Sequence, residues 1–253
     1  MSNHNPTQKV ALVTGAAGGL GQVFAQQLAT QGYRLVVTDR QAGTEALNQL
    51  VAELEAQGAP ARALACDLAD PQAVQALAAQ VLQAEGRVDV LVNNAAFMPH
   101  AALAATPLTL WREVMAVNVE APLLLAQALS AGMAERGWGR IVNLASSTVW
   151  GPPPGMGAYV SSKMGVIGLT RALAAELGGQ GVTVNAISPG LTRHPGSAAN
   201  LPEQAFEAVR QRQFIPRTET PADLVGMLAF LVSDAAAFIT GQVMNVDGGG
   251  FGF

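Results

Sequence analysis

The chain has 253 residues, of which 50% are hydrophobic and 13% are charged, and its net charge is −4. These values indicate an α/β protein with a large aliphatic core and argue against nucleic acid as the main partner, because no Lys/Arg cluster forms a basic stripe. Cys66 is the only cysteine, so no intramolecular disulfide can form. With neither a signal-peptide core nor an apolar run long enough to span a bilayer, we expect a soluble cytoplasmic protein without membrane contacts.

Short runs rich in β-branched residues alternate along the chain with segments rich in Ala and Leu. We expect strands at 9–14, 34–39, 61–67, 88–95, 139–145, 182–190 and 242–247. We expect helices at 20–31, up to about 57, and at 71–85, 108–136, 158–177 and 222–232. The stretch 108–136 should bend around Pro122, which cannot donate a backbone hydrogen bond. The alternation predicts a single α/β domain over 1–253, with a doubly wound, seven-stranded parallel sheet and helices on both faces.

The segment 191–220 has the weakest periodicity and directly follows the sixth expected strand. Ligands of doubly wound sheets bind at the carboxyl ends of the strands. We therefore interpret this segment as a small substrate lid; the alternative is a surface excursion with no role.

The first expected strand runs directly into "TGAAGGLG" (14–21). Glycines at such a turn let backbone N–H groups approach a pyrophosphate at a helix N-terminus, where the helix dipole favours negative charge. A tight connection that binds nothing is the alternative. The position of the turn in the first strand–helix unit favours a nucleotide.

Polar residues stand at the ends of the next three expected strands. The Asp39 carboxylate can accept hydrogen bonds from both hydroxyls of an adenosine ribose and repels a 2′-phosphate, which favours NAD. The adjacent Arg40 could instead bind a 2′-phosphate. The alternative role of Asp39 is to cap a helix. Asp67 could contact the adenine edge or, equally, cap the following helix. Asn93 and Asn94 could fix backbone groups beside the cofactor.

Tyr159 and Lys163 open the helix that follows the fifth expected strand, and their spacing places them on one helical face. A free tyrosine has a pKa of about 10 and is a poor base at neutral pH. We expect the Lys163 ammonium and a bound oxidised nicotinamide to lower the pKa of Tyr159 into a useful acid/base range. Without these charges the pair would be two ordinary helix residues.

Together with "NNAA" (93–96), "AVNVEAP" (116–122), Ser146, "SPGLT" (188–192) and "ITGQVMNVDGG" (239–249), these motifs resemble the short-chain dehydrogenase/reductase family along almost the whole chain. The resemblance implies a Rossmann-type fold and reversible hydride transfer with a nicotinamide cofactor. Two positions depart from the family pattern: Ala96 stands where glycine is usual, and Ala145 where a second serine is common.

The resemblance implies four catalytic residues. Tyr159 matches the general acid/base, Lys163 the residue that binds ribose and tunes the tyrosine, and Asn118 the asparagine that holds a proton-relay water. Ser146, rather than Ser147, stands at the family's spacing from the tyrosine and should polarise the substrate oxygen. The expected cofactor contacts are Gly15, Gly19, Leu20, Gly21, Asp39, Arg40, Asp67, Leu68, Asn93, Ala95, Tyr159, Lys163, Pro189, Gly190 and Thr192. Of these, the resemblance implies that Pro189 and Gly190 lie under the nicotinamide and that the Thr192 hydroxyl lies beside its carboxamide.

The expected substrate pocket is mostly apolar and suits a hydrophobic or aromatic ketone or secondary alcohol. Its candidate residues are Phe97, Ser146, Trp150, Met156, His194 and Phe214, and we see no metal-ligating group. Whether Trp150 leans into the pocket or packs outside it stays open. Parts of the chain are similar to phenylethanol dehydrogenases and pyridoxal dehydrogenase. The alternatives are an oxoacyl-carrier-protein reductase that uses NADP and, in another class, a non-catalytic dinucleotide-binding scaffold.

The resemblance also implies a homotetramer, with the helices at 108–136 and 158–177 forming one interface. The tail "GGGFGF" (248–253) should pack at another interface, because two terminal phenylalanines would otherwise stand in water.

Overall fold

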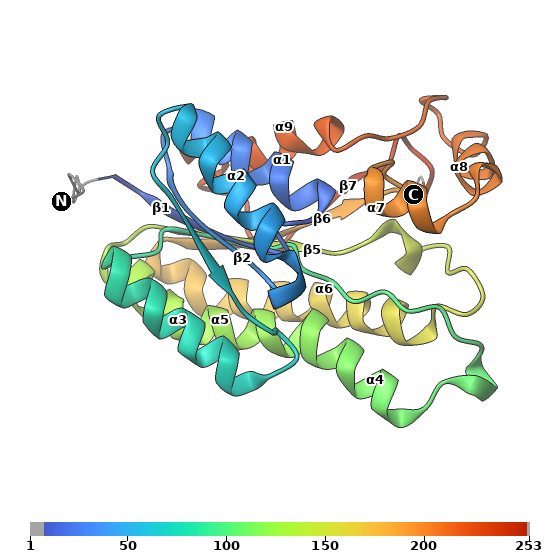
Figure 1. The fold of residues 1–253 in the computed structure, drawn as a ribbon, viewed down its shortest axis with the longest axis horizontal. Coiled ribbons are helices and arrows are strands. Elements are labelled where there is room, and N and C mark those ends of the chain that lie inside the picture. Colours follow the sequence, from blue (N-terminus) through green and yellow to red (C-terminus); the bar gives the residue numbers. More distant parts are fainter. Residues whose placement is uncertain (1–7, 252–253) are drawn as a thin grey trace.

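Seven parallel strands form one sheet in the computed structural model, which describes residues 8–251 (Figure 1). Their order is β3-β2-β1-β4-β5-β6-β7. The strands are β1 (Val10–Thr14), β2 (Arg34–Asp39), β3 (Ala61–Ala65), β4 (Val90–Asn93), β5 (Gly139–Leu144), β6 (Val182–Pro189) and β7 (Val243–Val246). After β3 the chain crosses back to place β4 beside β1, so the strand order reverses between these two. Such a reversal leaves a crevice at the carboxyl ends of the strands.

Helices cover both faces of the sheet, as the sequence predicted (Figure 1). One layer holds α1 (Gly19–Thr30), α2 (Thr44–Ala56) and α9 (Ala222–Leu231), and the other holds α3 (Pro71–Glu85), α4 (Leu108–Met115), α5 (Ala121–Glu135) and α6 (Gly157–Leu177). Successive residues of β1 supply the two cores: Ala11 and Val13 pack with the first layer, and Val10 and Leu12 with the second. Both faces of the strand are therefore dry, which explains its continuous apolar sequence.

Local sequence signals explain α3 well. Asp70 accepts a hydrogen bond from the N–H of Gln72 at 2.9 Å, Pro71 occupies the first turn, and Gly86 ends the helix with φ of 72°. These are the residue types that favour a helix start and a helix end. Asp67 does not cap this helix, contrary to one sequence interpretation; its carboxylate accepts from the N–H of Ala69 at 2.9 Å.

The expected long helix at 108–136 is divided differently from the prediction. A π-helical turn, Ala116–Glu120, separates α4 from α5. Pro122 follows this turn directly; because the helix continues through Glu120, its missing N–H removes a bond to the preceding turn, so the irregularity falls beside the residue that the sequence indicated. The turn carries Asn118, whose side chain is bound inside the fold, and π-turns of this kind are frequent at functional sites.

The helical stretch Leu108–Glu135 is, by length and composition, long and apolar enough to cross a membrane. Charged residues, Arg112, Glu113 and Glu120 among them, interrupt it, so it is not the uninterrupted apolar run that the sequence expectation excluded. In this fold the stretch packs against α3 and α6 and belongs to one covering layer of the sheet. The cytoplasmic location stays a prediction.

The segment 191–220 contains two short helices, α7 (Pro195–Asn200) and α8 (Glu203–Arg210), at one end of the sheet (Figure 1). Phe206 of α8 is buried, and the guanidinium of Arg193 stacks 4.1 Å from its ring centroid. A parallel bridge between Thr192 and Glu219 joins the two ends of the segment. The weak periodicity reflects helices too short to show a clear apolar stripe.

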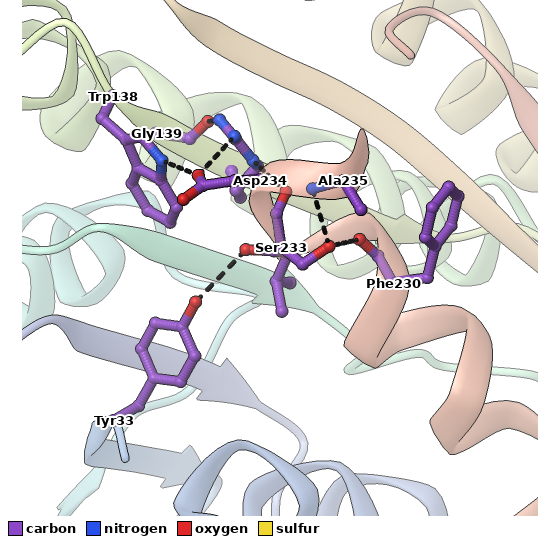
Figure 2. Close-up of polar contacts among 9 residues, drawn as sticks. Tyr33, Trp138, Gly139, Phe230, Ser233, Asp234 and Ala235 are labelled. Carbon is purple, nitrogen blue, oxygen red and sulfur yellow. Dashed lines mark hydrogen bonds and ion pairs between the residues drawn. The ribbon is translucent and has the colours of Figure 1, made fainter. Parts of the chain in front are cut away.

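At the opposite end of the sheet, a polar network joins β5 to the chain that follows α9. Figure 2 shows the indole of Trp138 and the ring of Tyr33 directed toward this chain. The Trp138 N–H donates to Asp234 at 2.7 Å, and the Tyr33 hydroxyl donates to the carbonyl of Val232 at 3.2 Å. Lys9 lies 3.4 Å above the Trp138 ring centroid, where burial lowers the pKa of its ammonium. This network fastens the last helix to the sheet.

Candidate active site

A cavity of about 480 Å³ opens at the carboxyl ends of β1 to β4, at the reversal of strand order. Four connections contribute to its wall: the glycine turn after β1 and the residues following β2, β3 and β4. Side chains from α4, the π-helical turn, α6 and the loop after β6 complete it. The expected site residues that line it are Gly15, Gly19, Leu20, Gly21, Asp39, Arg40, Asp67, Leu68, Ala95, Phe97, Tyr159 and His194.

The glycine turn is packed so closely that side chains would not fit. A Cβ on Gly15, whose φ is +65°, would lie 2.7 Å from the Cα of Ala95, and a Cβ on Gly21 would lie 2.3 Å from the carbonyl oxygen of Gly15. Glycine is the residue that tolerates both the positive φ and the close approach. The turn therefore presents bare backbone to the cavity at the start of α1.

Asn94 and Thr14 brace this turn against the loop after β4. The amide of Asn94 donates to the carbonyls of Thr14 and Gly15 at 2.9 and 3.0 Å. The Thr14 hydroxyl accepts from the N–H groups of Asn94 and Ala95, each at 3.1 Å. Asn94 lines the cavity and thus has the position that the sequence reasoning gave to Asn93.

Asn93 lies inside the sheet and not at the cavity. Its amide donates to Asn143 at 2.8 Å, and Asn143 donates to Thr170 at 2.9 Å. These bonds join β4, β5 and α6, so Asn93 supports the sheet beneath the site. Successive strand residues point to opposite sides, which explains why two adjacent asparagines have different roles.

The carboxylate of Asp39 is held at the end of β2 by two backbone groups. It accepts from the N–H of Ala17 in the glycine turn at 3.0 Å and from the N–H of Arg40 at 2.8 Å. A carboxylate offers about four acceptor positions, so both oxygens can accept further hydrogen bonds. Arg40 is exposed beside it, and neither contact of Asp39 caps α2.

Ser146, Tyr159 and Lys163 form a buried cluster beside the cavity, with exposed fractions of 8%, 7% and 2%. Ser146 follows β5 and lies close enough to the Tyr159 hydroxyl to favour its ionised form, which lowers the tyrosine pKa. The Ser146 oxygen also accepts from the hydroxyl of Thr148 at 2.9 Å. The Lys163 ammonium donates to the carbonyl of Leu144 at 2.5 Å and lies 5.7 Å from the Tyr159 ring centroid. The structure thus brings together three of the four predicted catalytic side chains.

Burial opposes the charged forms of both ionisable groups in this cluster. It raises the pKa of Tyr159, an effect that the nearby Ser146 reduces. It lowers the pKa of Lys163 to about 8. The sequence expectation concerned Lys163 together with a bound nicotinamide; in the chain by itself, desolvation is the largest effect on the hydroxyl and raises the pKa of Tyr159.

Asn118 holds the loop after β4 in place. Its carbonyl oxygen accepts from the N–H of Phe97 at 2.7 Å, and its amide donates to the carbonyl of Phe97 at 3.0 Å and to Ser162 at 2.9 Å. Ser162 in turn donates to the backbone carbonyl of Tyr159 at 2.7 Å. The sequence reasoning missed Ser162, whose only signal is its position directly before Lys163. With the Asn118 side chain so engaged, a relay water would have to bind its backbone carbonyl.

The loop after β6 carries the expected nicotinamide contacts, but they lie outside the wall of the cavity. Pro189 ends β6, and the N–H of Gly190 donates to Glu219 at 2.9 Å. The hydroxyl of Thr192 donates to the second oxygen of Glu219 at 2.6 Å. Glu219 is 5% exposed, and the sequence reasoning did not identify it.

The predicted substrate residues are dispersed. Phe97 lines the cavity. The Trp150 indole donates to Asn245 of β7 at 3.3 Å, Met156 precedes α6 in a half-buried position, and Phe214 is 82% exposed. None of these last three contributes to the cavity wall within residues 8–251. The hydrogen bond to Asn245 favours the alternative in which Trp150 packs outside the pocket.

His194 lies at the glycine turn and not among apolar substrate residues. A Cβ on Gly19 would be 2.6 Å from the Cβ of His194, so these two segments of the chain are in direct contact. Burial lowers the pKa of the imidazole, and its Nδ1 has no partner among the described residues. The segment 191–220 thus reaches the start of α1.

The proline-rich loop after β5 is joined to the loop after β4. The His100 imidazole pairs with the carbonyl of Pro154 at 2.9 Å, and the N–H of Ala101 donates to Gly155 at 2.9 Å. The ring of Phe251 packs against Gly151 of the same loop, where an added Cβ would lie 2.1 Å from it. The tail therefore begins by packing on its own chain; residues 252–253 lie outside the described part.

The comparisons with known proteins agree with this geometry. The family described as enoyl-(acyl carrier protein) reductase matches residues 15–250. The chain is 39% identical to the hydroxy(phenyl)methyl-succinyl-CoA dehydrogenase subunit BbsD of Thauera aromatica, covering 95% of this chain and 96% of that protein. It is also 39% identical to a 3-oxoacyl-acyl-carrier-protein reductase of Synechocystis, covering 96% and 97%.

Among solved structures, an actinorhodin polyketide ketoreductase with NADPH is similar. It superposes with a TM-score of 0.91 at 36% identity and covers 98% of this chain and 99% of its own. The resemblance found in the sequence is confirmed by these matches: the chain belongs to the short-chain dehydrogenase/reductase family of NAD(P)-linked oxidoreductases.

Proposed function

We propose that the protein is an NAD-dependent oxidoreductase that interconverts a hydrophobic secondary alcohol, such as an aryl alcohol, and its ketone. The observation that carries this proposal is the buried cluster of Ser146, Tyr159 and Lys163, with Tyr159 one helical turn before Lys163, beside a cavity walled by the glycine turn.

The residues at the cavity fit a dinucleotide. The first hydrogen bond inside α1 runs from Gln22 to Gly18, so the N–H groups of its first turn have no acceptor within the helix. Glycines keep these donors open to the cavity, where a pyrophosphate would accept from them. Asp39 stands at the end of β2 with acceptor capacity for the hydroxyls of the adenosine ribose.

Tyr159 is the proton-transfer group in this proposal. A bound nicotinamide supplies the site that takes up the hydride in oxidation and returns it in reduction. Tyr159 takes the hydroxyl proton of the alcohol, so the substrate loses one hydride and one proton and becomes the ketone. In reduction, Ser146 and Tyr159 donate hydrogen bonds to the carbonyl oxygen, and Tyr159 delivers the proton.

Lys163 and Asn118 support that step in different ways. The ammonium is held by the carbonyl of Leu144, and burial brings its pKa to about 8, so it retains a proton near neutral pH. A positive charge there, joined by that of an oxidised nicotinamide, would offset the burial that raises the pKa of Tyr159. Asn118 fixes Phe97 and, through Ser162, the backbone of Tyr159.

The cofactor preference is proposed on the strength of Asp39. A 2′-phosphate would be placed beside its carboxylate, which is held in position by Ala17. Arg40 is exposed at the same place and is the feature that favours NADP, the cofactor form bound in the similar ketoreductase. The second candidate function, reduction of an oxoacyl group on a carrier protein with NADP, is favoured by the Synechocystis relative.

Two further properties remain proposals. We infer that 191–220 acts as a lid over the cavity within a single domain, supported by the contact of His194 with Gly19. We also infer a homotetramer in which α4, α5 and α6 form one interface, supported by the part-exposed Trp111 and Met164 on these helices. Phe238 is fully exposed and would belong to a second interface.

A parallel screen tests the function. Aryl and alkyl secondary alcohols, the matching ketones and a 3-oxoacyl thioester are each offered with NAD(H) and NADP(H), and the reduced nicotinamide is followed by its absorbance. We expect turnover of aryl alcohols and ketones with NAD(H). Turnover confined to the thioester with NADPH would favour the second candidate, and dinucleotide binding without turnover of any substrate class would favour a scaffold.

A further inference from the structure

Glu219 is a buried carboxylate that no part of the proposed chemistry uses. It lies at the base of segment 191–220, where its two oxygens accept from the N–H of Gly190 at 2.9 Å and from the hydroxyl of Thr192 at 2.6 Å. Its backbone carbonyl accepts from the N–H of Arg193 at 2.7 Å. A Cβ on Gly190 would lie 2.5 Å from its carboxylate. Three hydrogen bonds, from Gly190, Thr192 and Arg193, thus fix the loop after β6 to this one residue.

The hydrogen bond between Glu219 and Thr192 determines whether the Thr192 hydroxyl can donate to a ligand or accept from it. A threonine hydroxyl has one proton and two lone pairs. The distance of 2.6 Å to Glu219 is that of a short O–H to carboxylate bond, so the proton is committed to Glu219. The Thr192 oxygen can then only accept, and a ligand group that meets it must be a donor.

We propose that Glu219 is a positioning residue for the nicotinamide end of the cofactor. Because Glu219 holds the proton of the Thr192 hydroxyl, this hydroxyl can only accept a hydrogen bond from the ligand. It therefore selects a bound nicotinamide whose carboxamide NH₂ faces Thr192. The inference rests on the proposed function, because it assumes that a nicotinamide lies beside this loop. A carboxamide oriented in this way has its carbonyl directed away from Thr192, which fixes the rotation of the group on the ring.

Protonation of Glu219 would reverse this polarity. The N–H of Gly190 needs an acceptor, so an added proton is accommodated on the oxygen that faces Thr192. Glu219 then donates to Thr192, and the hydroxyl proton turns toward the ligand. Burial raises the pKa of this carboxyl to about 7, which places the reversal close to neutral pH.

Three other charged side chains face Glu219 from the elements packed around it. Asp223, at the start of α9, and Asp247, after β7, raise the pKa of Glu219 by repulsion. Arg217 forms a two-pronged ion pair with Asp223 at 2.5 and 2.7 Å, and this pair holds the pKa of Asp223 well below its usual range. Asp223 therefore stays ionised and paired across the range in which Glu219 titrates.

The test compares three ligands that differ only at the nicotinamide end. NAD⁺ carries the NH₂ donor, 3-acetylpyridine adenine dinucleotide replaces it with a methyl group and keeps the carbonyl, and ADP-ribose has no ring. Binding is measured by calorimetry at pH 8.5 and pH 5.5. At pH 8.5 we expect the wild-type protein to bind NAD⁺ about three- to tenfold more tightly than the acetylpyridine analogue, the worth of one hydrogen bond.

Glu219→Gln provides the matched change, because glutamine keeps the shape of the side chain. Its oxygen can accept from Gly190 while its NH₂ donates to Thr192, which imposes the reversed polarity at every pH. We expect the preference for NAD⁺ to disappear or invert in this variant at both pH values, with ADP-ribose bound as in the wild type. Glu207→Gln, on α8 and about half exposed, is the control and should keep the wild-type preference.

Four results would overturn the inference. For the wild type, these are equal binding of NAD⁺ and the acetylpyridine analogue at pH 8.5, and a preference for NAD⁺ over the analogue that is the same at both pH values. For Glu219→Gln, they are an unchanged preference for NAD⁺ over the analogue, and an equal loss of ADP-ribose and NAD⁺ binding. If Glu219→Gln does not fold, Thr192→Val decides, since it must abolish the preference. Failure of NAD⁺, NADP⁺ and ADP-ribose all to bind would instead contradict the proposed function and remove the basis of this inference.

Discussion

The two ends of the sheet differ in how far their buried polar groups are hydrogen-bonded. At the amino end, Asp89 is fully buried and accepts from the N–H of Val10 at 2.8 Å, from Arg87 at 2.6 and 2.8 Å, and pairs with Arg136 at 3.3 Å. At the carboxyl end, several buried polar atoms have no hydrogen-bond partner within residues 8–251; they belong to Thr38, Asn93, Ser188, His194, Gln213 and Asn245.

This difference separates stability from binding. Buried polar groups are normally paired, and an unpaired one costs about 1–3 kcal/mol. The amino end makes its bonds within the chain and contributes to the stability of the fold. The carboxyl end keeps unpaired groups, and one of them, the imidazole of His194, lines the cavity, where a ligand or water can complete it. Changes at the two ends should therefore affect different measurements, and the following variants test that separation.

The largest effect is expected for Tyr159→Phe at the carboxyl end. Removing one hydroxyl leaves the ring packed but removes the proton-transfer group, so we expect turnover to fall by about 10²- to 10⁴-fold. The free energy of unfolding and the affinity for NAD⁺ should change little. Initial rates, urea unfolding and calorimetry check the three quantities. Activity that survives this change would contradict the proposed mechanism.

Asp89→Asn should produce the opposite pattern. It leaves Arg87 and Arg136 without their shared carboxylate, and breaking a buried pair costs about 3–5 kcal/mol. Because side-chain exposures of 25% and 29% let water solvate the two arginines, we expect the loss of unfolding free energy to be at or below the lower end of this range. Urea unfolding measures it. Rates and NAD⁺ affinity at a temperature where the variant is folded should match the wild type; a selective loss of activity would break the separation.

The pH dependence of stability gives an intermediate effect at the carboxyl end. Glu219 has a pKa of about 7 in the fold, above the ordinary value of 4.5, so the folded protein binds more protons than the unfolded chain between these values. Its contribution to stability is present below pH 4.5 and is lost as the pH rises through 7. We expect the melting temperature of the wild type to decline more steeply from pH 5 to pH 8 than that of Glu219→Gln. Parallel curves would contradict the raised pKa.

Trp138→Phe should have the smallest effect. Phenylalanine keeps much of the packing and loses the hydrogen bond to Asp234, which is exposed, so we expect a loss of about 0.5–1.5 kcal/mol in unfolding free energy. Thermal and urea unfolding measure the change. Turnover should be unaffected, because the network in Figure 2 lies at the amino end of the sheet.

The layout of the sheet was predictable because buried strands carry continuous apolar runs and each is followed by a helix. The bounds of β2 and α3 agree with the expected ones, and the glycine turn was identified from a local pattern. Asn94 was not chosen over Asn93, because the choice depends on which side of the strand each residue faces at its end. An irregularity beside Pro122 was expected, but its form, a π-helical turn that carries Asn118, was not.

Glu219 shows the limit most clearly. Its partners Gly190 and Thr192 lie 29 and 27 residues earlier in the sequence, and nothing in the intervening segment indicates that its ends meet. Likewise, His194 was placed with the substrate because it follows a strand end, whereas its contact with Gly19 depends on how the whole segment folds back.

The bridge between Thr192 and Glu219 has a consequence for how this fold can diversify. Because the two ends of the segment are fixed to each other, the 26 residues between them can change in length or sequence without moving Gly190 or Thr192. Insertions in loops cost little once the ends are held, and each doubling of length adds only about 0.6 kcal/mol. If the segment acts as the proposed lid, substrate range can evolve at its tip while Glu219 and Thr192 keep its base in place, which makes 193–218 the natural segment to exchange when a new specificity is sought.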